Sequence, residues 1–108
     1  MQAITEQISL AREFLGLSAR IECSISALPN QKGAWVILFA AGIAAHQPTN
    51  VQWQGPFYSV NEAASMLKTI VENLLKMDYL PTREPFIWSL HTQAQLRRLS
   101  DCNALRLG

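Results

Sequence analysis

The spacing of hydrophobic residues changes from helical to strand-like near residue 20 of the chain. Over residues 3–15 apolar residues recur every three to four positions, which predicts an amphipathic helix that Gly16 terminates. The residues of that apolar stripe are Ile4, Ile8, Ala11 and Leu15. Residues 20–28 then alternate between polar and apolar types, which is typical of a strand with one face in water, here the face that carries Arg20 and Glu22.

Two further strand patterns follow a polar, turn-rich stretch at residues 29–33. Residues 34–45 are apolar on both faces and rich in β-branched and aromatic types, which favours a strand over a helix. Residues 51–54 alternate again, and Gly55 and Pro56 end the pattern. Three consecutive strands joined by short loops predict an antiparallel meander.

The clearest helix signal begins at Ser59. Ser59 and Glu62 have the spacing of a capping box, in which the serine hydroxyl accepts a hydrogen bond from the amide of Glu62. An apolar stripe then continues to about Met77, with charged residues on the opposite side. We expect a helix from this cap to Met77.

The remaining residues complete the predicted fold. Residues 78–85 contain two prolines and are expected to form a loop, 86–90 a short strand, and 92–106 a short helix. Together the elements predict one α+β domain over residues 1–108. It is expected to be a two-layer sandwich, in which two helices flank one face of a three-stranded antiparallel meander (αβββα order), with a short C-terminal strand and helix appended.

The αβββα order of residues 3–77 resembles that of the double-stranded-RNA-binding domain, whose second helix also follows a loop containing glycine. That family places a cluster of lysines at the start of its second helix to contact phosphates. Residues 60–64 of this sequence hold the acid Glu62 and no basic residue. The resemblance implies a weak nucleic-acid-binding module as one alternative function, and the missing lysines count against it.

Composition and charge narrow the class of protein. Hydrophobic residues make up 49% of the 108 residues, which excludes a disordered chain and suffices for a core without disulfides or metal. The net charge of +1 provides no strong field, so nucleic acid is not expected to be a main partner. The N-terminus does not resemble a signal or transit peptide, and residues 34–45 are too few to cross a bilayer. We therefore expect a cytoplasmic protein that does not contact membranes.

The residues able to perform chemistry match no known catalytic or metal-binding spacing. His46 lies in a predicted turn and His91 at an element boundary, and neither has an acid or a cysteine beside it. Cys23 falls on the apolar face of its strand, where a thiol is expected to stay protonated and inert, and Cys102 is expected to be reduced. We expect no catalytic activity, cofactor or metal. A small enzyme that uses His46 or His91 is a second alternative.

The candidate contact residues are aromatic, apolar or basic. Trp and Tyr are enriched at interface hot spots, and clustered arginines can contact an anionic group, although aromatic residues can also close the end of a sandwich and arginines can be merely solvated. The residues expected to contact a partner are Val36, Leu38, Trp53, Tyr58 and Trp88. Those expected to contact an anionic group are Arg97, Arg98 and Arg106.

The second face of the sheet determines the expected oligomeric state. Val36 and Leu38 point to the face that the two flanking helices leave open, and large apolar groups there form a patch suited to association. Either the C-terminal segment folds back over that face, or a second copy of the chain covers it in a twofold homodimer. The sequence thus predicts a small, non-catalytic interaction or regulatory protein that self-associates and binds an unidentified protein.

Overall fold

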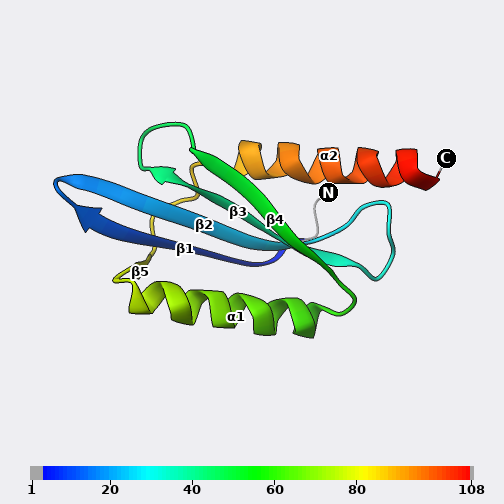
Figure 1. Cartoon of the computed structure of the whole chain (residues 1–108), viewed down its shortest axis with the longest axis horizontal. Coiled ribbons are helices and arrows are strands. Elements are labelled where there is room, and N and C mark those ends of the chain that lie inside the picture. The colour runs from blue at the N-terminus through cyan, green and yellow to red at the C-terminus, as the bar shows by residue number, and fades with distance from the viewer. Residues whose placement is uncertain (1–3, 108) are drawn as a thin grey trace.

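The computed structural model describes residues 4–107, with side chains from residue 6 to residue 99, and the described part folds as an α+β domain of five strands and two helices (Figure 1). The strands are β1 (Ile4–Phe14), β2 (Leu17–Ala27), β3 (Trp35–Ile43), β4 (Asn50–Phe57) and β5 (Leu80–Thr82), and the helices are α1 (Val60–Lys76) and α2 (Ser89–Leu107). All neighbouring strands pair antiparallel in one sheet, in the order β4-β3-β2-β1-β5.

The N-terminal segment departs furthest from the sequence prediction. Residues 3–15 were predicted to form a helix, but Ile4–Phe14 is strand β1, which pairs with β2 along almost its whole length. A four-residue interval keeps two side chains on the same face of a helix and also of a strand, so this spacing does not distinguish the two. Gly16 lies in the turn of a β-hairpin and does not terminate a helix. Leu15 and Gly16 both have positive φ, as a tight two-residue turn between antiparallel strands requires.

The C-terminal half contains a second correction. The predicted strand at residues 86–90 does not form, and the short strand β5 lies instead within the predicted loop, where it pairs with β1. The meander of β2, β3 and β4 is confirmed, with β2 and β4 longer than predicted and β3 shorter, and the final helix is confirmed as α2. The chain is α+β as predicted, but the αβββα order is not observed.

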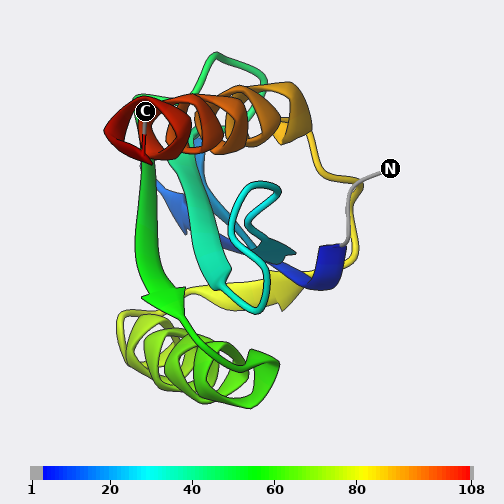
Figure 2. The same cartoon turned by 90° about the vertical axis from the view of Figure 1, so that its right-hand side faces the viewer.

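The two helices lie on opposite faces of the sheet, so the domain has three layers where two were predicted (Figures 1 and 2). On the first face, α1 packs Ala63 and Leu67 against Cys23, Ile25 and Ile37. The second face is covered by α2, whose buried Leu96 packs in a cluster with Leu28, Ala34, Val36 and Leu38. Adjacent residues of β3 therefore point into different cores, which explains why this strand is apolar on both faces.

This packing decides between the two covers that the sequence left open for the second face. Val36 and Leu38 are 0% exposed, and the C-terminal segment covers them within the same chain. They are therefore not accessible to a partner. The predicted homodimer is not tested by this result, but the reason for placing its interface at these residues no longer holds.

The predicted capped helix is confirmed as α1. Ser59 has extended backbone, and its hydroxyl oxygen accepts a hydrogen bond of 3.1 Å from the N–H of Glu62. At the other end, the N–H of Met77 donates to the carbonyl of Leu74, and the N–H of Asp78 donates to that of Leu75. This cap fixes where α1 begins after β4 and so places its apolar stripe on the first face of the sheet.

Replacing Ser59 with alanine should lower the free energy of unfolding by about 1 kcal/mol, because one amide of the first turn loses its acceptor. Urea denaturation measures the change. Ser65→Ala provides the control, since Ser65 is exposed in the middle of α1 and alanine has the higher helix propensity. Equal losses in the two variants would contradict the assignment of Ser59 as the cap.

Candidate functional site

A buried ion pair lies on the second face of the sheet, on the middle of β2. The Nε of Arg20 is 2.8 Å from Oε2 of Glu22, and the two side chains are only 2% and 1% exposed. Alternation along the strand directs both residues to the same face. Burying two charges costs several kcal/mol per ion unless further hydrogen bonds satisfy them, so the remaining partners decide whether the pair is tolerated.

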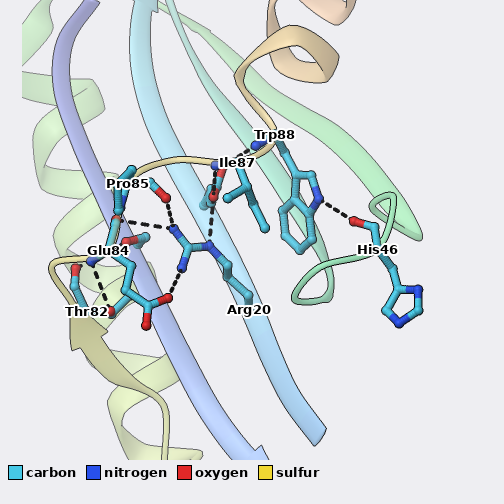
Figure 3. A network of polar contacts seen from close by, with 9 residues as sticks. Arg20, His46, Thr82, Glu84, Pro85, Ile87 and Trp88 are labelled. Atoms are coloured by element: carbon cyan, nitrogen blue, oxygen red, sulfur yellow. Dashed lines mark hydrogen bonds and ion pairs between the residues drawn. The ribbon is translucent and has the colours of Figure 1, made fainter.

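The guanidinium of Arg20 finds its other partners in the chain that links β5 to α2 (Figure 3). One nitrogen, Nη2, donates to the carbonyl of Pro85 at 2.7 Å and to that of Glu84 at 3.3 Å. The other, Nη1, donates to the Glu84 carboxylate at 3.3 Å, although the Glu84 side chain is 75% exposed. Arg20 therefore holds this linker against the sheet mainly through its backbone.

Glu22 holds the start of α2. Its carboxylate accepts the N–H of Ile87 at 2.7 Å and the N–H of Trp88 at 3.0 Å. The carbonyl of Trp88 in turn accepts the N–H groups of His91 and Thr92, so it begins the hydrogen bonding of the helix. The ion pair thus sets the point at which α2 starts and the face that it covers.

Trp88 links the start of α2 to the loop between β3 and β4. Its indole is 2% exposed, and Nε1 donates to the carbonyl of His46 at 2.8 Å (Figure 3). Sequence reasoning treated Trp88 as a candidate partner contact. The structure places it in the interior of the chain, where it packs α2 onto the sheet.

An open cleft of about 620 Å³ lies beside this network and brings both histidines together. His46 and His91 line it along with Arg20, Glu84 and Trp88. In the described part of the chain neither imidazole ring has a hydrogen-bond partner, and the Glu84 carboxylate is turned to Arg20. The cleft therefore shows no base oriented by an acid, which is the arrangement that activates a nucleophile. No cluster of three or more His, Cys, Asp or Glu suited to a metal occurs among the described residues.

Cys23 lies on the first face of the sheet, under α1, and has no disulfide partner. Burial, together with the nearby charge of Glu22, raises the pKa of its thiol from 9.0 to about 12. The thiol is therefore protonated at neutral pH, and it is not a nucleophile.

The edge strand β4 is the most exposed part of the sheet. Its eight residues include no charged side chain, and Trp53 is 38% exposed with Gln52 and Gln54 exposed on either side of it. At the opposite edge β5, which has only three residues and contains Pro81, pairs with residues 9–11 of β1 and leaves the rest of that strand's outer edge without a strand beside it in the described part of the chain. Short strands and proline are common ways to block an edge, and β4 uses neither between Asn50 and Gln54.

The remaining candidate contacts are scattered. Tyr58 is exposed just after β4. Arg97 and Arg98 are exposed on α2, where Arg98 donates to the side chain of Gln95. The side chain of Arg106 lies outside the described residues. The structure therefore brings Trp53 and Tyr58 to one strand edge and its exit, and places the two described arginines on a separate element.

A comparison with protein-family models places this chain in a family. One model matches residues 1–108. The chain belongs to the PA4575-like protein family. The search of curated proteins and the search of solved structures found no match. The description of the PA4575-like family specifies no activity, so the function has to be inferred from the chain's own geometry. Among residues 4–107 of this family member, no helix is long and apolar enough to cross a membrane.

Replacing Glu22 with glutamine should lower the free energy of unfolding by about 3–5 kcal/mol, because Arg20 would keep a buried charge without its counter-ion. Chemical denaturation followed by Trp fluorescence measures it. The control is Glu84→Gln, which removes the other carboxylate on the same arginine. Because Glu84 is largely exposed, the loss there should stay below about 1 kcal/mol. Similar losses for both variants would show that burial of the Arg20–Glu22 pair is not what matters.

The buried thiol predicts a pH dependence above pH 9. Because the folded pKa of Cys23 is raised, its contribution to stability is complete below pH 9 and is lost as the pH rises toward 12. The free energy of unfolding of the wild type should fall by about 1.4 kcal/mol per pH unit relative to Cys23→Ala. Urea titrations at pH 7, 8, 10 and 11 measure the difference between the two proteins. A difference that stays constant over this series would contradict the assignment.

Proposed function

We propose that this chain is a small, non-catalytic cytoplasmic protein-interaction domain, and that it binds its partner through the exposed edge of β4. The observation that carries the proposal is the uncharged edge strand around Trp53. An edge strand presents unpaired backbone N–H and C=O groups, and a partner strand can add to it by forming the next ladder of the sheet. Affinity would come from these backbone bonds.

Side chains beside the ladder would provide specificity. Trp53 pairs with Leu38 across the ladder to β3 and so projects from the second face, next to α2. Its partly exposed indole offers a large apolar surface at the edge, of the type that anchors protein interfaces. Gln52 and Gln54 project from the first face, where they pair with Phe39 and Ile37.

The geometry gives less support to the alternatives. The likeness to the double-stranded-RNA-binding domain rested on an element order that the chain does not have. Arg97 and Arg98 could neutralise only a few phosphates, so nucleic-acid binding would be weak, and its affinity would depend only shallowly on salt concentration. For the alternative of an enzyme using His46 or His91, the cleft offers space, but no carboxylate orients either ring.

Site-specific photocrosslinking in the native host tests the proposal. With p-benzoylphenylalanine in place of Trp53, irradiation should yield discrete adducts, because the partner strand lies against this side chain. The matched control places the same amino acid at Asn73, which is exposed on α1. If position 53 gives no more adduct than position 73, the β4 edge is not the binding surface.

A further inference from the structure

We infer that the partner strand belongs to a second copy of this chain, paired antiparallel with β4 across a twofold axis at Trp53. The inference rests on the proposed function and names its partner. The two copies would form one continuous sheet, with α1 and α2 of each copy on its two faces.

Symmetry restricts how β4 can pair with itself. A twofold axis perpendicular to the sheet leaves each face of the sheet on its own side. Neighbouring residues of a strand point to opposite faces, so opposed residues must be an even number of positions apart. The axis therefore has to pass midway between one residue and its own symmetry mate, which lie opposite each other. Each side chain before that residue then faces the side chain at the same distance after it in the other copy, and the two must be compatible.

The sequence at the centre of β4 meets this condition. Gln52, Trp53 and Gln54 read the same in both directions. With the axis at Trp53, the two indoles meet on the second face, and Gln52 lies opposite Gln54 of the partner subunit on the first face. A glutamine amide carries both donors and an acceptor, so such a pair can be mutually satisfied. Paired aromatic side chains across strands are also favourable. An unrelated strand could bond the backbone, but it would not in general supply this match.

Charge does not oppose the pairing. No charged residue lies between Asn50 and Phe57, so the twofold axis brings no like charges into direct opposition in the ladder. The whole chain has a net charge of only +1, so repulsion between two copies is weak.

Pairing of β4 with its own symmetry mate limits the assembly to two copies. The contact uses the same surface on both copies, so it closes as a dimer. The ladder between β4 and β3 is regular from Asn50 to Gln54 and irregular beyond Gln54. At the other edge of the sheet β5 pairs with only three residues of β1 and contains Pro81, so that edge differs from β4 and has no part in the proposed contact.

The helices supply the area that a single strand lacks. Stable interfaces bury roughly 1,200–2,000 Å² in total, which is more than two short strands provide. Both α1 and α2 contact β4, and they lie along the long axis of the molecule on either side of this edge (Figures 1 and 2). In the dimer each helix would approach its symmetry mate across the axis and extend the contact on both faces.

Light scattering of charge-swapped variants tests the dimer and its axis. The wild type at tens of micromolar should have twice the chain mass of 12.1 kDa. One variant carries Gln52→Lys with Gln54→Lys, and the other carries Gln52→Glu with Gln54→Glu. In each, the proposed axis places like charges opposite one another, so each alone should run at the mass of one chain. An equimolar mixture should recover the mass of two chains, because Lys then faces Glu.

The matched control is Gln7→Lys with Leu17→Lys, which adds the same charge at exposed positions of β1 and β2, on the side of the sheet away from β4, and should leave the dimer intact. Circular dichroism of every variant should match the wild type. A wild type that stays at one chain mass, with crosslinks from position 53 to a different protein, overturns the second copy but leaves the proposed function in place. Charge variants that remain dimeric overturn β4 as the interface. Folded variants that do not recover on mixing overturn the axis at Trp53.

Discussion

The buried pair of Arg20 and Glu22 is the interaction on which the rest of the fold depends. Two charges on the interior of a sheet are tolerated only when backbone groups complete their hydrogen bonding, and the linker before α2 supplies those groups. That requirement draws the linker across β2 and fixes the start of α2. The helix then lies over Val36 and Leu38 and closes the second face. The outer edge of β4 has no strand beside it.

Local signals in the sequence were sufficient for the elements that they specify. The capping box at Ser59 predicted the start of α1. Alternation predicted the outer strands of the meander, and β-branched and aromatic content predicted the central one, because all these patterns involve residues close in sequence. The N-terminal strand was missed because its apolar spacing also suits a helix. Arg20 and Glu22 were predicted to lie on the solvent-exposed face of their strand, again because the prediction used only the local pattern. Their burial depends on residues 84–88, which are more than sixty positions away in the chain.

The same limit applies to the candidate contact residues. Trp53 and Trp88 are the same residue type, but their environments differ. Trp53 is partly exposed on the edge strand, whereas Trp88 is buried and donates a hydrogen bond to the carbonyl of His46. Sequence correctly indicated that Val36 and Leu38 needed a cover, and only the tertiary structure shows that α2 provides it. With that face closed, the surface open to association is a strand edge and not an apolar patch. Backbone groups rather than buried area then become the main source of recognition.

Amide hydrogen exchange resolved along the chain tests this account most directly. The backbone amides of Ile87 and Trp88, which donate hydrogen bonds to the Glu22 carboxylate, should exchange as slowly as the amides in the centre of β2 and β3. The outward amides of β4 should exchange quickly in dilute protein and become protected as the concentration rises. Rapid exchange at Ile87 and Trp88 would contradict the anchoring of α2 by the ion pair. Protection of β4 that does not depend on concentration would show that its edge is not open.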